Sequence, residues 1–428
     1  MKLFIAILLN MLLLTAIGWW LRCAYRRAGP TLQRWLLPTL ALRVAAGLSS
    51  HGLDSEFALR WGKFLTAQFW EQPGAAWALW QGHELHGGGP PYMLYEWSNT
   101  LFIIKIVGIL NLASLGSYWL TSIYLSVGSF MGCWLLVCTL GQLFPAASSG
   151  AGVVAFLLWP STVWWASGIT KETLVLGSGA ALTALVMNAV YGAVPQSGWA
   201  RLRRWLWLGL LAWLHVRMRY FFALPLLGSL LALVGTTLAQ RRGWLRAGWL
   251  PVALAMLAGV VAAGTVAVGV GGEPVSKAFV TSQLWQSYVH GLATSTGRPH
   301  LVYRYLQPTV SSMASYFPLA AAQTLVRPWL GESALPRYVG VGLENILLVS
   351  LLICSAVAVV RGRPGRLPPA LVLALLLYCL LLAGLIGLST PNLGTLHRYR
   401  AVLLPWLLWL LLQPDYARRL LRRLKIGS

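Results

Sequence analysis

Residues 36–56 read LLPTLALRVAAGLSSHGLDSE, an apolar run that passes directly into the first carboxylates of the chain, Asp54 and Glu56. The pattern predicts a membrane-embedded helix that ends just before these acids. An ionisable side chain next to the hydrocarbon layer is costly to place there and usually has a functional role. The side of the membrane that Asp54 faces, and the groups that gather there, therefore bear directly on function.

The composition of the chain is that of an integral membrane protein. Of its 428 residues, 57% are hydrophobic and only 10% are charged, and the mean hydropathy is +0.67. Apolar runs of about 17–25 residues, the length of a membrane-spanning helix, alternate with short Arg-rich segments. These values exclude a soluble globular protein.

The positive charge is distributed along the chain in small groups. The net charge is +23 at pH 7, and the arginines lie between the apolar runs. This distribution is typical of positive-inside topology, in which cytoplasmic loops carry the excess of Lys and Arg and face anionic lipids. A nucleic-acid-binding protein of this charge would carry a separate basic domain, and the sequence contains none. Membrane lipids are therefore predicted partners, and nucleic acid is not.

Neither the cysteines nor the N-terminal run indicates secretion. Four of the five cysteines lie in apolar runs and Cys23 lies in a basic loop, so we expect packed free thiols rather than a disulfide framework. The run after Met1-Lys2 ends in Gly18-Trp19-Trp20-Leu21-Arg22, which is a poor cleavage site for a signal peptidase. We therefore interpret this run as a retained first span.

The predicted fold class is all-α: a polytopic membrane protein with about 11 transmembrane helices, forming a single integral membrane domain over residues 1–428. The N-terminus is assigned to the outside, and residues 414–428 to a basic cytoplasmic tail. The predicted spans are residues 3–21, 35–48, 118–140, 150–166, 173–191, 205–214, 221–238, 249–270, 338–360, 367–388 and 401–412.

Two long loops are predicted on the outer face, at residues 51–116 and 271–337, and each is expected to contain interfacial helices. In the first loop, residues 57–80 are rich in Trp and polar residues, which suits helices that lie at the membrane interface. Residues 100–115 are apolar but short, and Lys105 interrupts them, so we expect a re-entrant or interfacial helix. A full span here would invert the positive-inside topology of the arginine groups that follow.

Breaks are expected within several of the spans. Trp159-Pro160-Ser161 should kink or end its helix, because proline removes a backbone donor. Arg43, inside the second span, should snorkel or face the interior of the bundle. A short outer loop is predicted at residues 389–400.

Residues 215–220 are predicted to separate two short segments, 205–214 and 221–238. Ten helical residues rise only about 15 Å, so the first segment is too short to cross the membrane. Arg217 and Arg219 between the segments are therefore expected at an outer or mid-depth cavity.

This topology gathers acids and arginines on the outer face, several of them at helix ends. Guanidinium groups bind a phosphate or pyrophosphate through fork-shaped donors, and a carboxylate can deprotonate an incoming hydroxyl. The candidate catalytic residues are Asp54 and Glu56. The candidate residues for binding substrate or a lipid phosphate are Lys171, Glu172, Arg217, Arg219, Arg304, Arg327, His397, Arg398 and Arg400.

Each of these groups also has a purely structural interpretation. Asp54 is of a type that often caps a helix. Residues 171–172 can form a local Lys–Glu ion pair that contributes little to stability. The arginines can pair with lipid headgroups or anchor the chain at the interface. For Arg398 and Arg400, the preceding Asn392-Leu393-Gly394-Thr395 is typical of a tight turn, which would hold the two side chains in fixed positions.

No metal site is predicted. His83-Glu84-Leu85-His86 lacks the histidine spacing of a metalloprotease, and no further ligand accompanies it. Gly87-Gly88-Gly89 is predicted to be a turn, because the Lys-Ser/Thr pair and the following helix of a phosphate-binding loop are absent.

Two segments of the chain combine charged residues with the ends of apolar helices. Phe156-Leu157-Leu158-Trp159-Pro160-Ser161 runs on to Ser167-Gly168-Ile169-Thr170-Lys171-Glu172, downstream of the acid in the first outer loop. Near the C-terminus, His397-Arg398-Tyr399-Arg400 precedes Ala401-Val402-Leu403-Leu404-Pro405. This layout, over the N-terminal half and the final hairpin, resembles that of the GT-C class of integral membrane glycosyltransferases.

The resemblance implies a sugar donor linked to polyprenyl phosphate. Asp54 would be the base that activates the acceptor hydroxyl. Arg398 and Arg400, with Arg217 or Arg219, would hold the lipid phosphate as it leaves.

The first loop departs from the pattern of the GT-C class, which often has adjacent acids there. In this chain Ser55 separates Asp54 from Glu56. The identity of the base and a requirement for a divalent cation therefore stay open.

The predicted function is the transfer of a sugar from this lipid donor to a glycan, lipid or protein acceptor at the periplasmic face of a bacterial inner membrane. One alternative is a polymerase or ligase of polysaccharides such as O-antigen, which acts on lipid-pyrophosphate-linked glycans and depends less on Asp54. Another is a transporter or lipid flippase. Helix breaks at Pro160 and Pro225 favour it, whereas the lack of paired half-repeats in the sequence is evidence against it. The transferase interpretation requires Asp54 and the arginines before the last span to open into one outer cavity.

Overall fold

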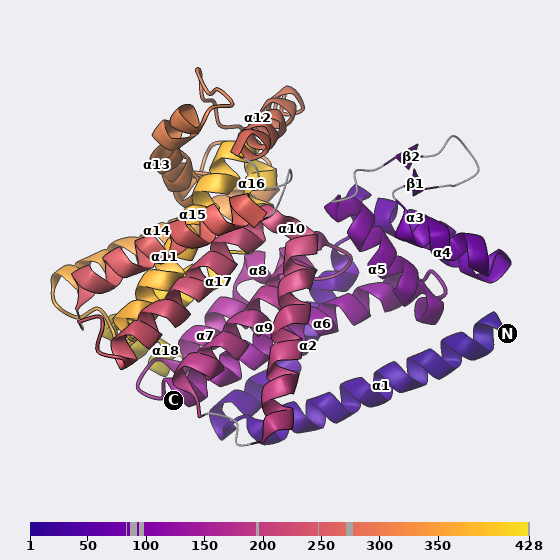
Figure 1. Cartoon of the computed structure of the whole chain (residues 1–428), viewed down its shortest axis with the longest axis horizontal. Coiled ribbons are helices and arrows are strands. Elements are labelled where there is room, and N and C mark those ends of the chain that lie inside the picture. Colours follow the sequence, from indigo (N-terminus) through magenta and orange to yellow (C-terminus); the bar gives the residue numbers. More distant parts are fainter. Residues whose placement is uncertain are drawn as a thin grey trace. The chain divides into compact units, whose positions relative to one another are not determined.

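The computed structural model (Figure 1) describes residues 1–82, 84–85, 92–93, 98–193, 197–246, 248–270 and 277–426, and these residues are mostly helical. One antiparallel pair of two-residue strands, β1 (Glu84–Leu85) and β2 (Tyr92–Met93), accompanies the helices. The predicted all-α membrane fold is confirmed. His83, His86 and the predicted glycine turn at residues 87–89 lie outside the described residues.

The N-terminal half of the chain forms helices α1 to α9 and a π-helical turn, η1. Their bounds are α1 (Lys2–Arg27), α2 (Pro30–Ser49), α3 (Leu53–Glu71), α4 (Pro73–Gln81), α5 (Asn99–Ser114), α6 (Tyr118–Leu143), α7 (Ser149–Val153), η1 (Val154–Leu158), α8 (Pro160–Trp165) and α9 (Lys171–Tyr191).

The C-terminal half forms helices α10 to α18. Their bounds are α10 (Gly198–Arg241), α11 (Trp249–Val270), α12 (Lys277–Ala293), α13 (Val310–Val326), α14 (Pro336–Val360), α15 (Pro369–Ser389), α16 (Leu393–Arg400), α17 (Leu404–Leu411) and α18 (Asp415–Arg423).

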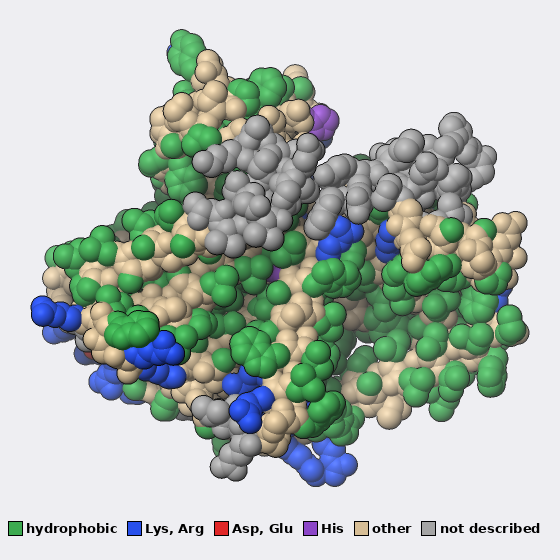
Figure 2. Space-filling model, viewed as in Figure 1, with side chains coloured by type: hydrophobic (Ala, Val, Ile, Leu, Met, Phe, Trp, Pro, Cys, Tyr) green, Lys and Arg blue, Asp and Glu red, His purple; other side chains and the backbone are tan. Residues whose placement is uncertain are grey.

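Within the described ranges, six helices are long and apolar enough to cross a membrane: α1, α6, α9, α10, α14 and α15. Two further apolar segments, α5 and Trp249–Gly264 of α11, are shorter. The other predicted crossings correspond to α2, which contains Pro38 and Arg43, and to helices that are divided into short pieces. On the face that Figure 2 draws, hydrophobic side chains cover much of the described surface, with Lys and Arg in small separate groups.

The chain divides into two compact units. Unit 1 comprises Met1–Cys138, Val163–Leu182 and Gly209–Tyr220. Unit 2 comprises Thr139–Thr162, Thr183–Leu208 and Phe221–Ser428.

In unit 1, helices α6 and α9 approach closely because small residues line their crossing. A Cβ atom added to Gly132 of α6 would overlap the carbonyl group of Gly177 in α9, and one added to Gly177 would lie 2.7 Å from the Cα of Ser129. Without a hydrophobic driving force between helices in lipid, close contact of this kind provides much of the packing energy.

A buried arginine joins α2 to the rest of unit 1. The Arg43 side chain is 0% exposed, and its Nη1 donates hydrogen bonds to the carbonyl oxygen of Ala166 (2.9 Å) and to Oγ of Ser129 (3.2 Å). Of the two predicted placements for Arg43, the structure shows the one inside the bundle. Its hydrogen bonds offset part of the cost of removing the charge from water.

Unit 2 has its core around α13, α15 and α17. A Cβ atom at Gly387 of α15 would overlap the backbone of Ala320 in α13, so these two helices are in direct backbone contact. All eight residues of α17 are buried, and α17 packs against η1, α14 and α15.

The predicted helix break at Trp159 is confirmed. η1 ends at Leu158, Trp159 has an extended conformation (φ −62°, ψ 125°), and α8 begins at Pro160. Proline is well suited to the first position of a helix, where its missing donor is not required. The predicted helices in the two long loops are also present, as α3, α4 and α5 in the first and α12 and α13 in the second.

The predicted separation of two segments at residues 215–220 is confirmed at one residue. Two helical stretches meet within α10 at Arg219, whose φ of −157° and ψ of 90° are not helical. The neighbouring residues of this stretch are helical, so the separation is a kink rather than a connecting loop.

The predicted last span at residues 401–412 and the predicted loop at residues 389–400 are wrong. The loop contains the helix α16, and the apolar run forms only the eight-residue α17 after a turn at residues 401–403. Eight helical residues rise about 12 Å, which is less than half of the hydrocarbon thickness.

The close crossing of α6 and α9 predicts that Gly132→Ala destabilises the protein by about 1–3 kcal/mol, because the added methyl group overlaps the Gly177 backbone. The matched control is Gly128→Ala, one turn earlier on α6, where an added Cβ meets nothing within 4 Å. Thermal unfolding of the detergent-solubilised protein would measure both. Equal melting temperatures for the two variants would contradict this packing.

Candidate functional site

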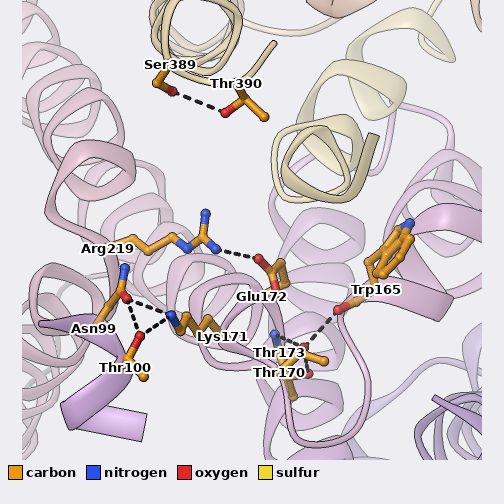
Figure 3. Close-up of polar contacts among 10 residues, drawn as sticks. All are labelled: Asn99, Thr100, Trp165, Thr170, Lys171, Glu172, Thr173, Arg219, Ser389 and Thr390. Atoms are coloured by element: carbon orange, nitrogen blue, oxygen red, sulfur yellow. Dashed lines mark hydrogen bonds and ion pairs between the residues drawn. The ribbon is translucent and has the colours of Figure 1, made fainter. Parts of the chain in front are cut away.

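The turn between α8 and α9 is built so that two charged residues begin a helix. Gly168 has φ +73°, which favours glycine, and its N–H donates to Oγ of Ser126 (2.8 Å). The hydroxyl of Thr170 accepts a hydrogen bond from the backbone N–H of Thr173 (3.2 Å) and so caps α9. The helix then starts with Lys171 and Glu172 (Figure 3).

Lys171 connects the start of α9 to the start of α5. Its Nζ lies 2.7 Å from Oδ1 of Asn99 and 2.7 Å from Oγ1 of Thr100, the first two residues of α5 (Figure 3). The Lys171 side chain is half-buried. The positive ends of two helix dipoles and an ammonium group therefore meet at one point of unit 1.

Glu172 forms a buried ion pair with Arg219. Nη2 of Arg219 lies 2.7 Å from Oε1 of Glu172, and the two side chains are 8% and 0% exposed (Figure 3). Arg219 is the residue at which α10 leaves the helical conformation. The ion pair thus ties the kink of α10 to the first turn of α9, with a short charge-assisted hydrogen bond.

Arg217 also lies beside the first turn of α5. Its guanidinium carbon is 5.5 Å from the centre of the Phe102 ring, a cation–π distance, and Phe102 in turn makes an edge-to-face contact with Trp213 (5.4 Å between ring centres). The side chain of Arg217 is half-buried.

Three of the four charged side chains here are cations, Lys171, Arg217 and Arg219, and Glu172 is the acid paired with Arg219. Cations beside two helix N-termini favour an anion.

Asp54 and Glu56 lie in the first turn of α3, and both are exposed. The segment just before α3 packs on the α8–α9 turn: a Cβ atom at Gly168 would lie 2.8 Å from Oγ of Ser50. Asp54 follows this contact by four residues, and Gly52, not Asp54, is the N-cap of α3. The acids and the turn that presents Lys171 therefore belong to the same part of unit 1.

Arg400 in unit 2 is held by the backbone. It is 0% exposed, and its Nη1 donates to the carbonyl oxygens of Thr324 (3.2 Å), Leu325 (3.2 Å) and Arg327 (2.9 Å) and to Oδ1 of Asn345 (2.8 Å). These bonds fasten the end of α16 to the end of α13. The arrangement favours a positioning role for Arg400, with the half-buried Arg398 on the same helix more accessible to a ligand.

Sequence reasoning missed Glu344, an acid within the predicted span at residues 338–360. Its Oε1 accepts a hydrogen bond from Oγ of Ser161 (2.5 Å), and its Oε2 lies 3.7 Å from Nε2 of His397. Burial lowers the pKa of His397, although the nearby Glu344 carboxylate acts in the opposite direction. A carboxylate inside an apolar run is itself the signal that would have identified this group.

The side chains of the other two predicted arginines make no hydrogen bond or ion pair with either group in the described part of the chain, although the Arg327 carbonyl accepts from Arg400. Arg304 is exposed between α12 and α13. Arg327 follows α13 and forms an ion pair with Glu332 (2.7 Å from Nε to Oε1).

The candidate residues thus fall into two groups. Lys171, Glu172, Arg217 and Arg219 gather in unit 1, which also carries Asp54, and residues 397–400 lie in unit 2. The predicted cavity that Asp54 shares with Arg398 and Arg400 involves residues of both units and stays a prediction. In the described part of the chain, no three or more His, Cys, Asp or Glu side chains gather as metal ligands.

Comparisons with protein-family models, with curated proteins and with solved structures found no match for this chain. Functional interpretation therefore depends on the chemistry of the two groups.

The buried ion pair predicts a non-additive pair of substitutions. Glu172→Leu alone should destabilise the protein by about 3–5 kcal/mol, because it leaves the Arg219 charge buried without this carboxylate. Combining Glu172→Leu with Arg219→Met removes both charges and should recover most of that loss. A double-mutant cycle by thermal unfolding would measure the coupling, and additive effects would contradict the pair.

Proposed function

We propose that the protein is an integral membrane glycosyltransferase that transfers a sugar from a polyprenyl-phosphate donor to a hydroxyl of an acceptor, at the periplasmic face of a bacterial inner membrane. The observation that carries the proposal is the gathering of Lys171, Arg217 and Arg219 where α5 and α9 begin, in the unit that bears the exposed Asp54.

The positive group in unit 1 suits the phosphate of a lipid donor. Lys171 is half-buried and stands at two helix N-termini, where backbone donors and dipoles favour an anion. The ion pair with Glu172 fixes Arg219, so Lys171 and Arg217 are the side chains proposed to contact the phosphate. A site at membrane depth also suits a donor whose hydrocarbon chain stays in the bilayer.

Asp54 is proposed as the general base. Its carboxylate would take the proton of the acceptor hydroxyl while the acceptor oxygen bonds to the anomeric carbon of the sugar. The bond between that carbon and the phosphate oxygen breaks, and the oxygen keeps the electron pair. The cations of unit 1 would stabilise the negative charge that develops on the departing polyprenyl phosphate.

A transporter or lipid flippase is a second candidate, and one observation favours it. In unit 2, Glu344 lies between two helix breaks. Ser161, which donates a hydrogen bond to Glu344, follows the break at Trp159. His397, whose Nε2 is 3.7 Å from Glu344, comes shortly before the turn at residues 401–403. Broken helices around an ionisable residue are a known arrangement for ion and substrate sites in transporters. Movement of a lipid-linked sugar across vesicles without a new glycosidic bond would favour this candidate.

The role of Asp54 predicts that Asp54→Asn lowers sugar transfer by about 10²–10⁴-fold, the usual contribution of a general base. Transfer of an isotope-labelled sugar from a polyprenyl-phosphate donor would be the measurement. Glu71→Gln is the matched control, because Glu71 is an exposed acid at the opposite end of α3. Full activity of Asp54→Asn would remove Asp54 as the base and favour a polymerase or ligase acting on lipid pyrophosphate.

The phosphate site predicts weaker donor binding when Lys171 is neutralised. Lys171→Met should raise the dissociation constant of a polyprenyl phosphate by about 10–100-fold, since a hydrogen bond to a charged group contributes about 1.5–3 kcal/mol. Lys63→Met, at an exposed lysine of α3, should have little effect. Equal affinities of the two variants, measured by equilibrium binding of the labelled lipid, would place the phosphate elsewhere.

A further inference from the structure

Two basic segments of unit 2, far apart in the sequence, are joined by a direct contact. One is the turn between α14 and α15 (residues 361–368), and the other is residues 413–426, which lead into α18 and follow it. The exposed cations of the two segments are Arg361, Arg363 and Arg366 in the turn, and Arg419, Arg422, Arg423 and Lys425 in and after α18.

The contact between the segments is made at Gly365. This residue has φ +103°, and a Cβ atom added to it would lie 3.0 Å from Cβ and 3.3 Å from the carbonyl oxygen of Gln413. Gln413 precedes the start of α18 by two residues. The turn therefore packs on the segment that leads into α18, within one compact unit (Figure 1).

α18 is fixed to unit 2 rather than being a loose tail. Ala417 and Leu421 are buried, and α18 packs against α7. Nη2 of Arg418 donates to the carbonyl oxygen of Ala146 (2.9 Å), and the Tyr416 hydroxyl donates to the carbonyl oxygen of Leu411 (3.2 Å). The position of the exposed arginines is thus set by the fold.

The outward side of α18 combines positive charge with apolar surface. Leu420 and Leu424 are 49% and 57% exposed, beside Arg419 and Arg423. This combination is typical of a helix that lies at the boundary between headgroups and acyl chains. Asp415 is the one acid in the sequence of these two segments (361–368 and 413–426), and its carboxylate lies 3.9 Å from Arg418.

We infer that these seven cations form one binding surface, the α18 basic surface, for the headgroups of anionic phospholipids. Phosphate is the acceptor that matches the fork of donors on arginine, and basic pockets beside transmembrane helices recognise lipids of this kind. Because the surface joins two arginine groups from separate segments, it suits a headgroup with two phosphates better than one with a single phosphate.

Lipid titration of the purified full-length protein in a neutral detergent, followed by native mass spectrometry, tests this surface. The probes are tetraoleoyl cardiolipin, with two phosphates, and dioleoyl phosphatidylglycerol and phosphatidylcholine. We expect the wild-type protein to bind cardiolipin at least tenfold more tightly than the other two lipids. Replacing either arginine group by glutamine should abolish this preference: R361Q/R363Q/R366Q in the turn, or R419Q/R422Q/R423Q in α18.

The matched control is R201Q/R203Q/R204Q, which removes three positive charges from the start of α10. It should retain the preference for cardiolipin. An equal loss in the control would show that total charge alone is responsible, and loss in only one of the two test variants would show that the segments do not form a joint surface. Tighter binding of a single-stranded RNA oligonucleotide than of cardiolipin at physiological salt would also overturn the inference.

Discussion

The ion pair between Glu172 and Arg219 is the interaction on which the proposed site depends. A carboxylate and a guanidinium group that are almost fully buried are stable only together, because each alone would pay the full cost of leaving water. Their pairing fixes the kink of α10 relative to the first turn of α9. It therefore also fixes Arg217, two residues before the kink, and Lys171, which starts α9. The proposed donor site uses the cationic side chains that this ion pair holds in place.

Arginine has three distinct uses in this chain, which has 33 basic and 10 acidic residues. Arg43 and Arg400 are completely buried and donate to backbone carbonyl oxygens, so each fastens helices together. Arg219 needs a carboxylate because it lies at a kink. Arg419, Arg422 and Arg423 of α18 are exposed and are proposed to bind phosphates. With so few acids, most positive charges must find carbonyl oxygens or lipid as partners, and this shortage makes the placement of each carboxylate informative.

The sequence was sufficient where a single apolar run forms a single helix. The bounds of α6, α11, α14 and α15 follow from hydropathy, and the break at Trp159 follows from its proline. It was insufficient where distant partners decide the conformation. The kink of α10 lies at Arg219, whose partner Glu172 is 47 residues away in the sequence. α16 is helical although it was predicted to be a loop, and Arg400 at its end is held by carbonyl groups of residues 324–327 that no local pattern indicates. Glu344 was overlooked because its run is apolar overall, and its partners Ser161 and His397 lie far away in the sequence.

The most direct test is a cryo-electron microscopy structure of the full-length protein with a bound polyprenyl phosphate. If the proposed donor site is correct, the phosphate will lie within hydrogen-bonding distance of Nζ of Lys171, with the Asp54 carboxylate facing the same cavity. A phosphate bound only elsewhere, such as at the arginines of α18, with none beside Lys171, would contradict the glycosyltransferase site.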